Sequence, residues 1–197
     1  MTRKESILQV ATVLFSEKGY KETSIAELSK ISKVAEGTIF YHFNSKEELF
    51  LAVLKRTKET IIKEFESYMG NKKFKNGIEM IEDAVSFYLY FVGKMADQFL
   101  LLHRHFPYEI AEKNSACREN LVAIYDCIVD IFEEAIQTGI QDGSIKQLSA
   151  RKTALVIFSM VDGIARFKTY NLYNANSLFN EILGSCRSML QANINGG

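Results

Sequence analysis

Apolar residues in the first part of the chain recur at helical spacing. Within residues 3–18 they fall at i, i+4, i+7 and i+8 and are Ile7, Ala11, Leu14 and Phe15. This spacing places them on one side of a helix, so the pattern predicts an amphipathic helix over the segment. Gly19 follows directly and is suited to end that helix, because glycine adopts the left-handed conformation of a C-terminal cap without strain.

Residues 23–50 show a denser form of the same pattern, which predicts two short helices joined by a tight turn. Ser24 is a good N-cap, and Glu27 three residues later completes a capping box. One face of the first short helix is predicted from Ile25, Leu28, Ile31 and Ser32.

The second short helix is predicted from about Ala35 to Phe43. Its buried stripe is Ile39 and Phe43, four residues apart. The outer face and its flanks are left to Glu36, Gly37, Thr38, Phe40, Tyr41 and His42. A short helix with small residues at its start and hydroxyl, aromatic and imidazole groups behind them suits the major groove of DNA. The alternative is a helical hairpin with a solvated face.

The rest of the chain is predicted to be helical throughout. Helices are expected over 46–69, 78–96, 97–105, 117–141, 149–171 and 176–193. The run Gly70–Gly77 breaks the periodicity and predicts a loop. Pro107 restrains Phe106 away from helical geometry, so a boundary is expected there. The pattern therefore predicts an all-α fold of about nine helices.

Composition and charge limit the classes of function. The chain has 197 residues, 47% of them hydrophobic, which is enough for a substantial core in one or two domains. Its formal net charge is zero, and residues 1–50 hold seven Lys or Arg and seven Glu. A nonspecific DNA-coating protein would be strongly basic, so DNA binding here must depend on a few local groups and on a second copy of the domain.

Other sequence signals point to a cytoplasmic protein without cofactors. No run of about 18 apolar residues is present, and the first ten residues lack the apolar core of a signal peptide. Cys117, Cys127 and Cys186 are odd in number and lack metal-ligand spacing. We expect them to be reduced thiols that serve as small buried residues, with no metal site. An all-helical enzyme is disfavoured because no catalytic constellation or phosphate-binding glycine loop is present.

Residues 23–49 resemble the DNA-binding domain of the TetR/AcrR family of bacterial one-component regulators. The matching segments are Thr23-Ser24, Leu28-Ser29, Lys33-Val34, Gly37-Thr38-Ile39-Phe40-Tyr41-His42-Phe43 and Ser45-Lys46-Glu47-Glu48-Leu49. The resemblance implies a helix-turn-helix domain over residues 1–48, linked by helix 46–69 to an effector-binding and dimerisation domain over 49–197. It also implies a homodimeric, ligand-responsive repressor released from a palindromic operator. An activator, or a regulator that has lost DNA binding, remains an alternative.

Two positions depart from the family pattern. Lys33 stands where the family usually has the turn glycine, which implies a left-handed non-glycine residue at a cost on the order of 1 kcal/mol. Glu36 stands where the family often has a basic or small polar residue. A glutamate there accepts a hydrogen bond from a cytosine amino group or simply points to solvent, and both readings stay open.

The predicted DNA-binding residues are Ser24, Lys33, Glu36, Gly37, Thr38, Phe40, Tyr41, His42 and Lys46. Among them, Tyr41, His42 and Lys46 are assigned to phosphates. The base-reading set is Glu36, Gly37, Thr38 and Phe40. Arg3 and Lys4 are open between a backbone contact and a solvated tail.

Residues 78–167 are rich in aromatic side chains, and the resemblance implies an effector pocket among their helices. The candidate effector-binding residues are Phe87, Phe91, Phe99, His103, Arg104, Phe132, Phe158 and Arg166. Such a lining favours a largely apolar ligand, and the basic groups favour one with an acidic group, such as a fatty-acyl or aromatic-acid compound. The alternative is that the aromatic residues are ordinary core.

The last two predicted helices are candidates for a dimer interface in a four-helix bundle, as in the family. The predicted interface residues are Gly163, Leu178, Phe179, Ile182, Leu183, Cys186, Met189 and Leu190. The alternative is that these apolar stripes pack inside one monomer.

Overall fold

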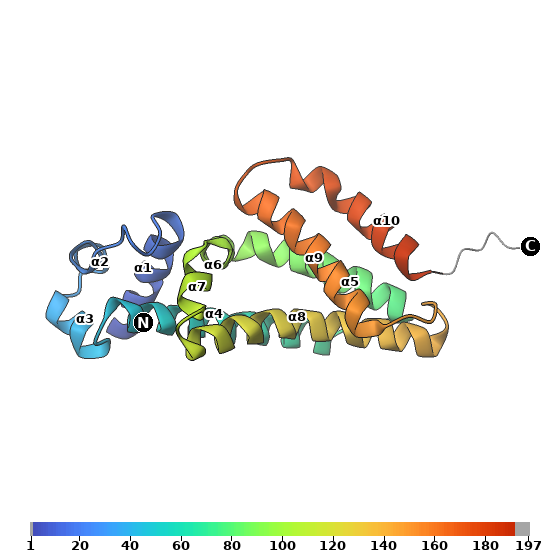
Figure 1. The fold of residues 1–197 in the computed structure, drawn as a ribbon, viewed down its shortest axis with the longest axis horizontal. Helices are drawn as coiled ribbons and strands as arrows, with labels where there is room; N and C mark the ends of the chain where they lie inside the picture. The colour runs from blue at the N-terminus through green and yellow to red at the C-terminus, as the bar shows by residue number, and fades with distance from the viewer. Residues whose placement is uncertain (1, 192–197) are drawn as a thin grey trace, which may run out of the picture. The chain divides into compact units, whose positions relative to one another are not determined.

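A computed structural model describes residues 2–191, and within them the protein is helical without strands (Figure 1). The elements are α1 Arg3–Glu17, α2 Ile25–Ser32, α3 Glu36–His42, α4 Lys46–Gly70, α5 Gly77–Lys94, α6 Ala96–His103, α7 Phe106–Ala111, α8 Ser115–Asp142, α9 Ala150–Thr169, the 3₁₀-helix η1 Ala175–Leu178 and α10 Phe179–Leu190. The predicted all-α fold is confirmed. Among the described helices, none combines the length and hydrophobicity needed to cross a membrane.

The chain packs as two compact units. Among the described residues, one unit contains 2–63 and 95–124, and the other contains 64–94 and 125–191. The helices α4 and α8 each contribute residues to both units. The helix α6 packs on α1 and so joins the N-terminal unit, while the predicted domain boundary at residue 48 stays a prediction.

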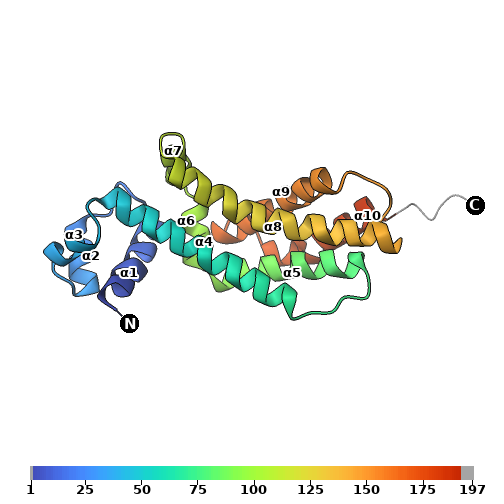
Figure 2. The ribbon, with the colours of Figure 1, turned by 90° about the horizontal axis from the view of Figure 1, so that it is seen from below.

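Local signals set the ends of several helices. Thr2 begins α1 with a reciprocal capping box, accepting from the backbone N–H of Glu5 while the Glu5 carboxylate accepts from Thr2. Gly19 has φ +89° just beyond α1. The loop between α4 and α5 falls between Gly70 and Gly77 (Figure 2). A helix boundary also falls at Phe106, but Phe106 is itself the first residue of α7, so the prediction that Pro107 holds it away from helical geometry was wrong.

The N-terminal unit is held by an aromatic cluster that joins α1, α4 and α7. Its members are Phe15, Tyr20, Phe50 and Phe106. The rings of Tyr20 and Phe106 stack with centroids 3.8 Å apart, and Phe50 meets Phe106 edge-on at 5.0 Å. Burial raises the pKa of the Tyr20 hydroxyl. These contacts fix the helices that support α2 and α3.

In the second unit, the first turn of α5 packs directly against the backbone of α8. A Cβ added to Gly77 would lie 2.1 Å from the backbone nitrogen of Gly139 and 2.4 Å from the carbonyl oxygen of Ala135. The Asp142 carboxylate accepts from the Gly77 N–H at 2.8 Å and so caps α5. Hydrogen bonds from Ser144 and then from Gly77 hold the pKa of Asp142 below its usual value. Gly77 is therefore a packing position.

Candidate nucleic-acid interface

The helix α2 begins and packs largely as its sequence predicts. The Ser24 hydroxyl accepts from the Glu27 N–H at 3.1 Å. The Glu27 side chain pairs instead with Lys18 at the end of α1, so only the Ser24 half of the predicted capping box is formed. Leu28 is fully buried, whereas Ile31 is 50% exposed, so the predicted face is covered at Leu28 and open to solvent at Ile31. The buried residues of this short helix are Leu28 and Ser32, and Ile31 lies about 100° around the helix from Ser32.

The turn between α2 and α3 depends on a left-handed lysine. Lys33 has φ 55° and ψ 33°, and the N–H of Val34 donates to the Ser29 carbonyl at 3.2 Å to close the turn. The predicted left-handed non-glycine residue is confirmed. The cost is on the order of 1 kcal/mol, and the rest of the domain must offset it. Lys33 is exposed, and it lies three residues before Glu36, the first residue of α3.

The helix α3 buries one edge and exposes the other. Ile39 is 1% exposed and the following Phe43 is 3% exposed, as predicted from their spacing. Tyr41 is 84% exposed and Phe40 47% exposed, although neither is a residue that favours water. The exposed residues of the outer face are Glu36, Gly37, Phe40 and Tyr41. Thr38 and His42 are half-buried at its flanks. Gly37 has no heavy atom within 4 Å of an added Cβ, so this surface is open.

A notch of about 460 Å³ lies where the start of α1 meets the turn before α3. It is lined by Thr2, Arg3, Ser6, Ser32, Lys33, Val34, Ala35 and Thr38. Lys33 and Thr38 of this lining are among the predicted interface residues, whereas Thr2 and Ser6 are not. The only signal for them was the group of hydroxyl and basic residues at the start of α1. Two cations and several hydroxyl groups in one concave surface suit a phosphate.

The structure gives Lys46 a different set of partners from the predicted phosphate. Its ammonium donates to the carbonyl oxygens of Tyr20 at 2.9 Å and Thr23 at 3.0 Å, with a longer bond to Lys21 at 3.4 Å. The ammonium also lies 4.4 Å from the centre of the Tyr20 ring. An ammonium has three donors, and these carbonyls use them. Lys46 therefore ties the α1–α2 loop to the start of α4.

Replacing Lys46 by methionine should lower stability without changing electrostatic binding. Loss of the charged hydrogen bonds should reduce the free energy of unfolding by about 1–3 kcal/mol. The slope of operator affinity against salt concentration should stay that of the wild type. Urea unfolding and a salt titration measure the two quantities. A slope reduced by about one, with unchanged stability, would restore the phosphate role.

The predicted effector residues in the second unit do not form one lining. Phe87 and Phe91 stack with centroids 5.5 Å apart and close around Phe65. Phe132 is fully buried, as expected of core. Phe158 is half-buried and meets Tyr88 edge-on and the Tyr125 ring at an angle, while Arg166 is exposed on α9. Their assignment to a ligand stays a prediction.

The remaining effector candidates belong to the N-terminal unit. Phe99 and His103 are buried and lie edge-to-face at 6.2 Å. The Arg104 guanidinium donates to the carbonyl oxygens of Ser16 at 2.9 Å and Glu17 at 2.7 Å. These carbonyls end α1, where a cation is favoured by the unpaired oxygens and the helix dipole. Arg104 therefore anchors α6 to α1.

The predicted dimer stripe on α10 lies largely inside its own unit. Ile182, Cys186 and Leu190 are at most 4% exposed, and α10 packs on α5 and α9. Their assignment to a dimer interface stays a prediction, and their burial in the single chain fits the alternative that the stripe packs inside one monomer. Burial, with a smaller effect from Glu82, raises the pKa of the Cys186 thiol to about 11. Phe179 lines a crevice against α5 and α9.

An exposed apolar face does occur on α9. Leu155 is 45% exposed and Val156 49%, and with Ser159 and Met160 they line a shallow surface hollow. Gly163 continues this face and has no heavy atom within 4 Å of an added Cβ. At 100° per residue these positions share one side of α9. Gly163, from the predicted dimer set, therefore lies on an open helix face. The structure buries neither Leu178, Leu183 nor Met189 fully.

One family and one relative match short stretches of the sequence. Residues 7–53 match the family described as bacterial regulatory proteins, tetR family. Over 54 residues the chain is 44% identical to the HTH-type transcriptional regulator QacR of Staphylococcus aureus, which covers 27% of this chain and 29% of that protein. The family match includes the exposed α3, and the alignment to QacR spans less than a third of that relative.

Solved structures match over nearly the whole chain. The transcriptional regulator FadR of Bacillus subtilis, in complex with stearoyl-CoA, is 22% identical with a TM-score of 0.75, covering 94% of this chain and 98% of that one. A protein of Saccharomonospora viridis described as a transcriptional regulator, in complex with choline, is 18% identical with a TM-score of 0.85, covering 96% and 97%. At these identities the likeness establishes the fold, and the two bound molecules differ in chemistry.

Proposed function

The chain belongs to the TetR family of bacterial regulatory proteins, and we propose on that premise that it is a homodimeric repressor that a small molecule releases from a palindromic operator. The observation that carries the proposal is α3. Its outer face exposes Phe40 and Tyr41 beside an open Gly37, while its inner edge is fixed in the core by Ile39. A rigid short helix with exposed aromatic and polar groups suits insertion into the major groove.

The groups around α3 divide into a set for contacts with phosphates and a set for reading bases. The notch that contains Arg3, Lys33 and Thr38 offers cations and a hydroxyl for a phosphate, which would set the register of the domain. Glu36, Gly37 and Phe40 on the outer face remain our base-reading set, with Thr38 at their edge. Tyr41 and His42 are assigned to phosphates. Ser24 stays a candidate because its exposed hydroxyl lies at the N-terminus of α2, where backbone N–H groups favour an anion.

A second copy is needed because one such domain makes few contacts. The apolar side of α9, with Val156 at its centre and Gly163 open to close approach, is the surface we propose for the two-fold contact. A two-fold dimer places two recognition helices about 34–36 Å apart, or a multiple of that distance, on a palindromic site. A small molecule acts by its different affinity for the DNA-competent and incompetent forms of that dimer.

A mobility-shift titration tests the function. The full chain is mixed with the DNA upstream of its own coding region, in the presence of excess unrelated duplex. We expect a specific complex containing two protein chains per duplex, with an affinity that falls as salt rises. Binding that unrelated DNA competes away completely would contradict an operator-binding function.

Replacing Tyr41 by alanine should weaken binding to operator and to unrelated DNA by the same factor. A lost hydrogen bond to a phosphate should cost on the order of tenfold in affinity. Tyr173→Ala is a matched control, because Tyr173 is 67% exposed on the other unit and should leave DNA affinity unchanged. Fluorescence anisotropy on both duplexes measures the effect. A loss confined to the operator would assign Tyr41 to base reading.

A further inference from the structure

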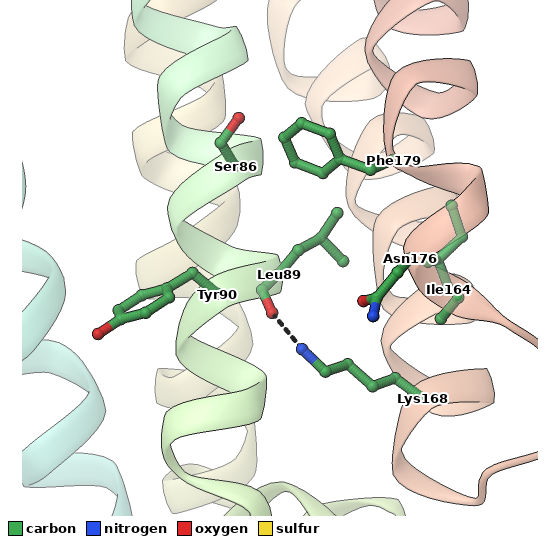
Figure 3. Close-up of a pocket in the computed structure, with 8 residues that line it drawn as sticks. Ser86, Leu89, Tyr90, Ile164, Lys168, Asn176 and Phe179 are labelled. Carbon is green, nitrogen blue, oxygen red and sulfur yellow. Dashed lines mark hydrogen bonds between the residues drawn. The ribbon is translucent and has the colours of Figure 1, made fainter.

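A crevice of about 400 Å³ lies within the second unit between α5, α9 and the η1–α10 segment (Figure 3). It is lined by Ser86, Leu89, Tyr90, Ile164, Lys168, Ala175, Asn176 and Phe179. None of the eight aromatic and basic effector candidates belongs to this lining. Its volume is in the range of small-molecule sites, about 300–1,000 Å³. Lys168 lies about 120° around α9 from Val156, whereas Ile164, four residues after Met160, borders the proposed two-fold surface.

The two ends of the crevice differ in chemistry. Leu89, Ile164 and Phe179 form apolar walls, and the Phe179 ring lies near Ser86 at one end (Figure 3). Lys168 occupies the other end, with the Asn176 amide near it (Figure 3). A site with apolar walls and polar groups gathered at one end is suited to an amphipathic molecule.

The charge at the polar end is positive. The Lys168 ammonium points toward the Leu89 carbonyl oxygen at 3.4 Å, a long hydrogen bond that uses one of its three donors (Figure 3). The eight lining residues include this cation and no carboxylate. A ligand cation would be repelled here, whereas a ligand carboxylate would form charge-assisted hydrogen bonds with Lys168 and accept one from the Asn176 amide.

Gly93 on α5 makes room for the lysine. A Cβ at this position would lie 2.7 Å from Nζ and 3.2 Å from Cε of Lys168. Any larger residue at 93 would displace the ammonium. The end of a lysine side chain is flexible, so this displacement would leave the helices in place. The Lys168 ammonium can therefore occupy this position only because residue 93 is a glycine.

We propose that this crevice binds a small amphipathic carboxylate, with its head group at Lys168 and Asn176 and its hydrocarbon tail along Leu89 and Phe179. The inference rests on the proposed function, for which it supplies the site and the chemical class of the effector. The apolar walls contribute affinity in proportion to the tail area they cover. The cation selects an acid over the matching alcohol, because only the acid pairs with the ammonium.

Isothermal titration calorimetry of the full chain with decanoate and with decanol tests the site. We expect the wild type to bind decanoate more tightly than decanol. Lys168→Met should weaken decanoate at least tenfold and decanol little, so that the preference for the acid disappears. Gly93→Ala keeps the charge but displaces it, and should weaken decanoate several-fold. Lys146→Met removes an exposed lysine that is not in the lining and should match the wild type.

Each other outcome overturns the proposal. Equal affinity of wild type and Lys168→Met for decanoate would place the carboxylate elsewhere, and no measurable binding of decanoate by the wild type would reject the ligand class. Circular dichroism confirms that each variant is folded. Operator binding by the ligand-free wild type separates the two hypotheses: if it is present without decanoate binding, only this inference fails. If operator binding is itself absent, the proposed function fails.

Discussion

Replacing Gly77 by alanine should lower the free energy of unfolding by about 3 kcal/mol or more, the largest stability effect we expect from a single methyl group. The added Cβ would lie 2.1 Å from a backbone nitrogen and 2.3 Å from Cα of Gly139. Backbone atoms cannot rotate away as a side chain does, so α5 and α8 must separate along their contact. Separation would also lengthen the hydrogen bond from the Gly77 N–H to Asp142. Urea unfolding followed by circular dichroism measures the loss.

Gly70→Ala is the matched control for this prediction. Gly70 ends α4 and has no heavy atom within 4 Å of an added Cβ, so the same methyl group should cost little there. Alanine is also the better helix former, by up to about 1 kcal/mol. A Gly77→Ala protein as stable as the Gly70→Ala protein would mean that α5 and α8 do not approach as closely as described.

Replacing Val156 by aspartate should dissociate the dimer and abolish operator binding at working concentrations. A charge placed in an apolar seam without a partner costs several kcal/mol, of order 2–7, which corresponds to at least about 30-fold in the dimer dissociation constant. The monomer should stay folded, because Val156 is 49% exposed in the single chain. Operator affinity depends on two domains held at fixed spacing, so it should fall with the dimer.

Sedimentation and anisotropy together measure this effect. Val122→Asp is a close control: this valine is 50% exposed on α8, outside the proposed surface, and the change should leave the dimer intact. If Val156→Asp remained a dimer at the wild-type dissociation constant, the two-fold contact would lie elsewhere. If it dissociated while operator affinity persisted, binding would not require the dimer.

Features decided by a few neighbouring residues were predictable from the sequence. Ser24 caps α2, Gly19 and Lys33 adopt left-handed conformations, and Ile39 turns inward. Each depends on the backbone geometry of one helix end or one turn, which chain neighbours control. The exposure of Tyr41 follows in the same way, because burying one edge of a short helix leaves the opposite edge to solvent.

The tertiary structure alone decided what each apolar face or charged group meets. The spacing of Ile182 and Cys186 predicts an apolar stripe on one side of a helix. It does not tell whether that stripe packs on α5 or on a second chain. The charges of Lys46 and Arg104 predicted contacts with ligands. In the structure each side chain donates hydrogen bonds to backbone carbonyls of a segment that is distant in the sequence. The crevice at Lys168 likewise requires three elements that are far apart in the chain. Periodicity fixes the direction of a side chain on its own helix, whereas its partner depends on how the helices pack.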